Sequence, residues 1–324
     1  MAPQIVAEDL SKQYRIYRRK GLFRREVLCK QALEGVSFQL NEGELVGYIG
    51  PNGAGKSTTV KILSGILTPD LGRCTVMGVT PWQQRMQHVA HIGVVFGQKS
   101  QLWWDLPVRD SFDLLRDIYR IPPEDCRKSL NRLTELLRLD EIWDTPVRQL
   151  SLGQRMRADL AASLLHRPRI LFLDEPTIGL DAVTKLTVRS FISEINREQG
   201  VTVILTTHDM DDVEALCSRV ILIGGGRIMM DGDIDELRRG HDERILQCRT
   251  QRPLPEALPL PAQLSRMNDG RTRLRFSPER LPTAELIDYL NRNFGLLDVT
   301  VDNLPIDEIV AKVYGEMDAW EAKP

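Results

Sequence analysis

The stretch GPNGAGKST at residues 50–58 constrains the fold of this chain more than any other feature. It satisfies the pattern GxxxxGK[ST], it follows the short apolar run ELVGYIG, and it leads into a segment that suits a helix. Glycines allow backbone N–H groups to turn toward phosphate oxygens, and the N-terminus of the following helix adds a positive dipole end. The sequence therefore predicts a strand, a phosphate-binding loop and a helix in that order.

Two side chains at the end of this loop carry its chemistry. The ammonium of Lys56 can reach the β- and γ-phosphates of a nucleotide, and the hydroxyl of Ser57 is suited to bind Mg²⁺. We expect the helix to begin at Lys56. The candidate phosphate-binding residues are Gly50, Pro51, Asn52, Gly53, Ala54, Gly55, Lys56, Ser57 and Thr58.

Acidic side chains end a second apolar run, ILFLDEP. In a protein with a phosphate-binding loop, Asp174 is suited to hold Mg²⁺ and Glu175 to polarise the attacking water. His208 follows the next apolar run, VTVILTTH. A lone histidine at such a place is more often a structural hydrogen-bonder, but a strand beside the acid pair would bring His208 close to the γ-phosphate.

Apolar strands alternate with helical segments along most of the chain, which indicates an α/β sheet. Residues 107–166 show mostly helical periodicity and form a predicted helical insertion. After Arg239 the texture changes: QRPLPEALPLP reads as a linker or an edge segment, and RTRLRF, a helix near residues 284–294 and LDVTVDN follow. We expect a first domain at residues 1–239 and a small accessory α+β domain at residues 240–324.

The N-terminal region combines two short alternating runs, IVAEDL and VSFQL, with a basic segment between them. We interpret the runs as edge strands and the basic segment as a solvated loop or hairpin. An alternative is contact with anionic lipid headgroups or nucleotide phosphates. The basic residues of the segment are Lys12, Arg15, Arg18, Arg19, Lys20, Arg24, Arg25 and Lys30.

Composition narrows the setting of the protein. The formal net charge of -2 disfavours a general polyanion binder, so we expect no nucleic-acid partner. Five scattered cysteines without a CxxC pair fit a reducing cytoplasm. No signal core or membrane-spanning run is present, so a membrane role would need a partner. His88 and His91 have HxxH spacing but no third ligand, and we interpret them as surface or packing residues.

Taken in order, these motifs resemble the nucleotide-binding subunit of an ABC transporter over roughly residues 4–235. The resemblance implies a P-loop NTPase core of the ABC ATPase type with a helical subdomain at about residues 98–167. It makes residues 50–58 the Walker A loop, and Asp174 and Glu175 the Walker B pair. It also implies that Tyr14 stacks on adenine. Gln98 would be the Q-loop glutamine and a metal ligand, with Gln101 as a weaker rival. Asp181 would be the D-loop acid, and His208 the H-loop switch.

The stretch LSLGQ is similar to the family signature LSGGQ and comprises Ser151, Leu152, Gly153 and Gln154. Leu152 replaces the first signature glycine, and IGLD replaces the usual SALD of the D-loop. In the family the signature serves the nucleotide of a second chain, so the resemblance implies a homodimer that closes on ATP and Mg²⁺. This would explain why one chain carries two phosphate-binding elements about a hundred residues apart.

The stretch GQKSQLWWDLP resembles a branch of bacterial ABC exporters that pair a separate permease with the ATPase. It implies ATP hydrolysis coupled to export at the cytoplasmic face of the inner membrane, with integral membrane permease subunits as partners. Leu102, Trp103 and Trp104 could dock the permease or belong to the core. The alternatives are a soluble ABC ATPase acting on ribosomes and a DNA-repair ATPase. A single Walker A loop opposes the first, and the absence of sustained heptads opposes the second.

Overall fold

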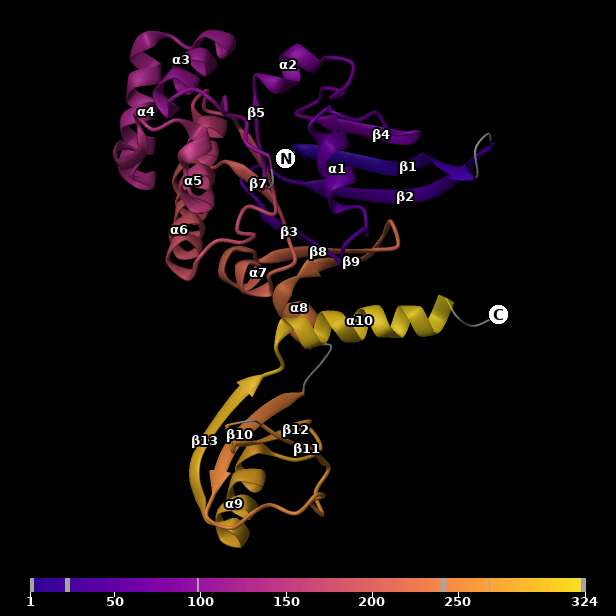
Figure 1. The fold of residues 1–324 in the computed structure, drawn as a ribbon. Helices are drawn as coiled ribbons and strands as arrows, with labels where there is room; N and C mark the ends of the chain where they lie inside the picture. The colour runs from indigo at the N-terminus through magenta and orange to yellow at the C-terminus, as the bar shows by residue number, and fades with distance from the viewer. Residues whose placement is uncertain (1–2, 21–23, 98, 240–242, 268, 322–324) are drawn as a thin grey trace. The chain divides into compact units, whose positions relative to one another are not determined.

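The computed structural model describes residues 3–20, 24–97, 99–239, 243–267 and 269–321. It divides into two compact units, Met1–Gly232 and Asp233–Pro324 (Figure 1). The change of composition after Arg239 falls just behind helix α8 (Ile234–Arg239), which contacts α10 (Ile306–Glu321) in the second unit. The boundary expected from composition thus follows α8, at Arg239, whereas the boundary between the two units precedes α8, at Gly232.

A six-stranded sheet forms the centre of the first unit. Its strands β5, β6, β7, β3 and β8 pair in parallel, and β9 follows β8 at the edge. The apolar runs of the sequence are its buried strands, because a parallel sheet covered on both faces shields every residue from water. The bounds are β5 (Ile92–Phe96), β6 (Ile170–Asp174), β7 (Thr202–Thr207), β3 (Leu45–Ile49), β8 (Arg219–Gly224) and β9 (Arg227–Asp233).

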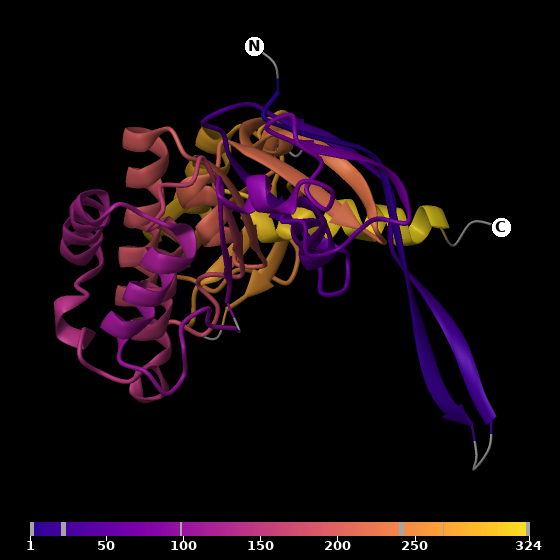
Figure 2. The ribbon, with the colours of Figure 1, turned by 90° about the horizontal axis from the view of Figure 1, so that it is seen from above.

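A second, antiparallel sheet of the first unit has the order β2 (Arg24–Leu40), β1 (Ile5–Lys20) and β4 (Leu71–Val76). Helix α1 (Lys56–Leu63) shares one hydrophobic core with both sheets. The prediction of edge strands is correct for β2 and wrong for β1, which lies between β2 and β4 and pairs with both. Both strands are also longer than predicted, since they remain paired as far as Lys20 and Arg24. Figure 2 shows the resulting hairpin running out from its sheet. The backbone N–H and C=O groups of the two strands pair with each other whatever the side-chain charge. The basic segment is therefore part of a hairpin.

Helices dominate the segment between β5 and β6, as predicted. They are α3 (Val108–Tyr119), α4 (Pro123–Leu137) and α5 (Leu152–Leu164). Helix α6 (Ala182–Gln199) connects β6 to β7, and α7 (Met210–Leu216) connects β7 to β8. The short helix α2 (Arg85–Val89) was not predicted, because five residues are too few to show a helical period.

The second unit contains both strands and helices. Its antiparallel sheet has the order β11 (Ala262–Arg266), β12 (Thr272–Phe276), β10 (Arg244–Thr250) and β13 (Leu296–Asn303). Helix α9 (Thr283–Phe294) packs Leu286 and Leu290 into the core of this unit. Leu254 and Leu258 of the proline-rich stretch are buried in the same core. This stretch therefore belongs to the second unit and is not a linker between domains.

Membrane-spanning length is not reached in the described part of the chain, where no helix is both long and apolar enough to cross a bilayer. Four of the five cysteines are buried, and only Cys29 is exposed.

Candidate nucleotide site

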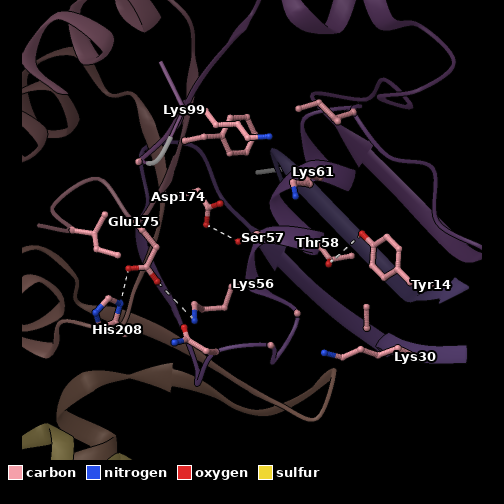
Figure 3. Close-up of a pocket in the computed structure, with 18 residues that line it drawn as sticks. Tyr14, Lys30, Lys56, Ser57, Thr58, Lys61, Lys99, Asp174, Glu175 and His208 are labelled. Carbon is pink, nitrogen blue, oxygen red and sulfur yellow. Dashed lines mark hydrogen bonds and ion pairs between the residues drawn. The ribbon is translucent and has the colours of Figure 1, made fainter. Parts of the chain in front are cut away.

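A cavity of about 850 Å³ lies where the phosphate-binding loop, the end of β6 and the end of β7 meet (Figure 3). Three segments that the sequence analysis placed at one site are therefore brought together. The parallel order β6, β7, β3 explains this, because all three strands present their carboxyl ends at the same edge. The lining residues are Tyr14, Lys30, Ala32, Asn52, Gly53, Gly55, Lys56, Ser57, Thr58, Lys61, Ile66, Phe96, Gly97, Lys99, Asp174, Glu175, Ile178 and His208.

The phosphate-binding loop is pressed against neighbouring strands, and this explains two of its glycines. A Cβ at Gly50 would lie 2.3 Å from the carbonyl oxygen of Ile223. Gly55 has φ +115°, and its Cβ would lie 2.6 Å from the carbonyl oxygen of Ala32. Only glycine fits such contacts. Gly50, Pro51 and Ala54 do not line the cavity, whereas the other six predicted loop residues do.

Lys56 folds back over its own loop. Its Nζ donates to the carbonyl oxygens of Gly50 at 2.6 Å and Pro51 at 3.2 Å, and it lies 3.8 Å from Glu175 Oε1. Burial holds the pKa of Lys56 below its usual value, although the carboxylates of Glu175 and Asp174 oppose this effect. The ammonium is thus largely removed from water and turned toward the acid pair, where an incoming phosphate would gain a strong electrostatic contact.

Asp174 and Ser57 place oxygen atoms side by side. Ser57 Oγ donates to Asp174 Oδ1 at 3.1 Å, and Thr206 Oγ1 donates to the same oxygen at 2.6 Å. Asp174 is buried at the end of β6. Hydroxyl and carboxylate oxygens suit Mg²⁺, which usually takes its remaining ligands from phosphates and water. Within the described residues, no group of three or more His, Cys, Asp or Glu side chains could hold a metal ion.

Glu175 and His208 form a pair at one end of the cavity. His208 Nδ1 lies 2.7 Å from Glu175 Oε2. Glu175 has φ +56°, which is uncommon for a residue with a side chain, and its N–H donates to Thr206 O at 2.9 Å. A Cβ on Gly97 would lie 2.1 Å from the carbonyl oxygen of Glu175. The backbone is thereby fixed so that the carboxylate faces the cavity (Figure 3).

The loop that carries His208 is anchored to helix α6. Asp209 forms an ion pair with Lys185. Asp212 is fully buried, and its Oδ1 accepts from Arg189 Nε at 2.5 Å. The acidic run after His208 is therefore part of the scaffold that positions the histidine. The sequence analysis missed this role, because its partners lie more than twenty residues away in the chain.

Tyr14 lines the cavity from the hairpin, with its hydroxyl 3.5 Å from Thr58 Oγ1. Gln98 lies outside the described residues. The rival glutamine, Gln101, does not line the cavity and is bound to helix α5 instead. Its N–H donates to Asp159 Oδ1 at 3.0 Å, and its Nε2 donates to the carbonyl oxygen of Asp159 at 2.7 Å.

The signature residues form the N-terminus of α5 and do not line the cavity of their own chain. Ser151 is the N-cap. Its Oγ accepts from the N–H of Gln154 at 3.2 Å, and its own N–H donates to Gln154 Oε1 at 2.9 Å. In this reciprocal capping box, the backbone N–H groups of Ser151 and Gln154 each donate to the side-chain oxygen of the other residue. The helix start is thus stabilised by side chains of its own first turn.

Leu152 lies opposite Gly179, in the segment that leads into α6, and Gly153 lies opposite Thr184, in the first turn of α6. A Cβ on Gly153 would lie 3.0 Å from Thr184 Cγ2, and a Cβ on Gly179 would lie 3.0 Å from Leu152 Cδ2. The departure from the usual signature is therefore accommodated by a glycine opposite the leucine side chain. Asp181 is exposed and caps α6 through Thr184 N at 2.9 Å and Oγ1 at 2.6 Å. These hydrogen bonds hold the pKa of Asp181 below its usual value.

Three lysines besides Lys56 line the cavity: Lys30, Lys61 and Lys99. None was singled out as a site residue by the sequence analysis. Lys30 belonged to the basic segment, for which contact with nucleotide phosphates was an alternative interpretation, and only the register of the hairpin, which pairs it with Tyr14, places it beside the cavity.

The two tryptophans of the SQLWWDLP stretch lie at the surface, with 38% of Trp103 and 53% of Trp104 exposed, whereas Leu102 is buried. The core interpretation is thus wrong for both tryptophans, and burial of Leu102 removes it from the predicted docking surface. The guanidinium of Arg155, on the signature helix, lies over the ring of Trp104 at 5.7 Å.

Comparison with known proteins supports the same assignment. The family model described as ABC transporter matches residues 33–178. A probable multidrug ABC transporter ATP-binding protein of Escherichia coli (strain K12), YbhF, is 37% identical over 209 residues, which make up 64% of this chain and 35% of that protein. The chain therefore spans about a third of the length of this relative. A probable sulfate/thiosulfate import ATP-binding protein of Chlorella vulgaris, CysA, is 36% identical over 233 residues, 72% of this chain and 92% of that protein.

A solved structure adds the nucleotide. The dimeric post-hydrolysis state of the ATP-binding cassette MJ0796, bound to ADP and Pi, has a TM-score of 0.62 and 26% identity, and it covers 71% of this chain and 98% of that chain. Its length matches the first unit, which carries the cavity and the signature residues. This chain belongs to the family of ABC transporter ATP-binding subunits, which are ATPases.

Proposed function

We propose that this chain hydrolyses ATP as a homodimer and powers export through a separate integral membrane permease at the cytoplasmic face of the membrane. One observation carries the proposal. The signature residues form a capped helix start, but they do not line the cavity that the phosphate-binding loop of the same chain forms. A second copy packed head to tail would bring Ser151 and Gly153 to the γ-phosphate.

The cavity residues divide the proposed reaction. Tyr14 stacks on adenine, residues 50–58 bind the phosphates, and Lys56 neutralises the β- and γ-phosphates. Ser57 and Asp174, with Gln98, hold Mg²⁺, which supplies charge stabilisation of the phosphates when bound. Glu175 accepts a proton from the attacking water, and its contact with His208 fixes the orientation of the carboxylate.

The exposed apolar surface of the helical region supports a permease contact. Trp103 and Trp104 lie there with Leu114 and Ile118 of α3, all of them exposed. Exposed aromatic side chains of this kind are typical anchors of protein interfaces. The direction of transport rests on the resemblance of the QKSQLWWDLP stretch to exporters and on the relative YbhF, named as a multidrug transporter subunit. CysA is named as an import subunit, so the direction needs its own test.

The test is reconstitution with the permease. The tagged chain is purified from membranes of its own organism, and a co-purifying integral membrane protein is identified and placed with the chain in proteoliposomes. ATP is added outside, where it reaches only complexes with outward-facing ATPase subunits. Export predicts ATP-dependent uptake of a drug, the cargo class named for YbhF, into the vesicle lumen, abolished by Glu175→Gln. Co-purification of ribosomal proteins alone, or uptake that is independent of ATP, would contradict the proposal.

A further inference from the structure

Of the three cavity lysines without a role in the proposed reaction, Lys30 lies beside the middle of the phosphate-binding loop. Lys30 lies on β2 and is paired in register with Tyr14 of β1, so both side chains leave the hairpin on the same face. Both line the cavity. The Nζ of Lys30 would lie only 3.8 Å from a Cβ placed on Gly53, in the middle of the phosphate-binding loop.

Lys30 and Lys56 approach this loop from different sides. Lys56 is buried and points to the end of the cavity with Glu175 and His208. Lys30 is exposed and lies at the other end, below the ring of Tyr14 (Figure 3). Its ammonium lies beside Gly53 and lines the cavity in front of the phosphate-binding loop.

We infer that Lys30 is a further nucleotide-binding residue that contacts the phosphates nearest the adenosine, the α- and β-phosphates. If adenine stacks on Tyr14 and the loop holds the phosphates, the chain from ribose to β-phosphate must pass between Tyr14 and Gly53, where the ammonium lies. A lysine on a flexible stem supplies a point charge there without fixing a bidentate geometry. Lys30 is thus a positioning residue for nucleotide binding and takes no part in the chemical step.

The inference rests on ATP binding by this chain and makes four measurable statements. Lys30→Ala and Lys30→Met should weaken ATP and ADP binding by the same factor, about three- to tenfold, because an exposed charge gains only a modest, screened energy. KM for ATP should rise while kcat at saturating ATP stays within about twofold. The loss should shrink at high salt, and Lys30→Arg should retain most of the affinity.

The matched control is Arg15→Ala, which removes a cation from the neighbouring position of the same hairpin, outside the cavity lining. Titration calorimetry with ATP, ADP and AMP on the full chain, followed by thermal melting of each variant, gives the readout. Wild-type affinity in both Lys30 variants, or an equal loss in Arg15→Ala, would overturn the inference. A loss confined to ATP would also overturn it, since it would place Lys30 at the γ-phosphate. If the wild-type chain binds no nucleotide, the proposed function fails instead.

Discussion

The two phosphate-binding elements of the first unit differ in almost every physical respect. Residues 50–58 form a loop pressed between strands, with a buried lysine and a cavity of about 850 Å³ in front of it. Residues 151–154 form a helix start that caps itself and does not line this cavity; Ser151 is exposed and the other three residues are half-buried. The first element is held in place by its own chain. The second is held by its own capping box, but it lies outside the cavity.

This difference teaches which part of the chemistry a single chain can supply. Electrostatic stabilisation is strong where water is excluded, as around Lys56, and weak at an exposed helix end. A signature that must act on a nucleotide therefore needs a second surface to exclude water. In the proposed dimer that surface is the partner's cavity, and mixed dimers can show whether the two elements act in one chain or across two.

The largest effect is expected at the cavity. Glu175→Gln keeps the shape of the side chain but cannot accept a proton from water, so turnover should fall about 10²–10⁴-fold. ATP should still bind, and ATP-bound dimers should accumulate, as measured by light scattering after size-exclusion chromatography. Wild-type turnover in this variant would remove Glu175 from the role of general base. Monomers in the presence of ATP would oppose the dimer.

Lys56→Ala should weaken both nucleotide binding and catalysis, because the same charge serves the ground state and the transition state. Mutations that remove one electrostatic group at a reacting centre cost about 10²–10³-fold in rate. Direct ATP binding and kcat are measured separately. Lys61→Ala is the comparison, since Lys61 also lines the cavity but does not contact the loop carbonyls. Equal losses of ATP affinity and kcat in both variants would mean that the total charge of the cavity matters. The specific position of the Lys56 side chain over its loop would then not matter.

Mixed dimers test the comparison itself. Lys56→Ala removes the loop charge, and Ser151→Arg places a bulky cation at the signature, so each homodimer should be nearly inactive. If the signature acts on the partner's nucleotide, a mixed dimer has one site with both lesions and one with neither, and activity partly returns on mixing. If the signature serves its own chain, every site keeps one lesion and no activity returns. Nucleotide-dependent crosslinking between position 151 and the partner's loop provides a readout that site-to-site coupling cannot hide.

The smallest effect concerns stability on the signature side. Burial raises the pKa of Asp159 on α5 to about 6, although hydrogen bonds from Gln101 and Ser100 oppose this. The folded state thus binds the Asp159 proton more tightly than the unfolded chain does. Its contribution to stability is full below the unfolded pKa and is lost as the pH rises through about 6, a change of at most about 3 kcal/mol.

Denaturant unfolding of wild type and Asp159→Asn between pH 4 and 7 measures this change. The difference in unfolding free energy, wild type minus variant, should fall as the pH rises. Asp181→Asn is the control of opposite sign, because hydrogen bonds from Thr184 lower the pKa of Asp181. Its stabilising contribution is present at neutral pH and is lost on acidification. A pH-independent difference for Asp159→Asn would show that the buried carboxyl does not titrate in this range.

Much of the cavity could be predicted from the sequence because its motifs are local. The loop pattern, the acids after an apolar strand and the histidine after the next strand each occupy a few adjacent residues, and parallel strand order brings them together. Lys30 could not be predicted in the same way. Its place depends on hairpin register, which bulges shift between Ala7 and Gln13 before Tyr14 is reached. Charge alone could not distinguish it from its neighbours.

The exposure of individual side chains and their contacts with residues distant in the chain could not be predicted from the sequence either. The tryptophans after Gln101 have the same apolar character as core residues, and only the path of the chain into α3 leaves them at the surface. The acids that follow His208 read as an ordinary first helical turn, yet Asp212 is fully buried against Arg189. The proline-rich stretch misled because its prolines suggest a linker, while the leucines between them supply the core of the second unit.

The capping box of α5 has one consequence for how a ligand would meet this helix. The oxygen of Ser151 already accepts the Gln154 N–H, so one of its lone pairs is engaged. A hydroxyl also has a proton to give, and none of the capping bonds uses it. An arriving phosphate oxygen could therefore take that proton as a hydrogen bond while the cap stays intact. The signature serine is a latent donor: its rotation is already restrained, and docking would convert a structural residue into a contact without unwinding the helix start.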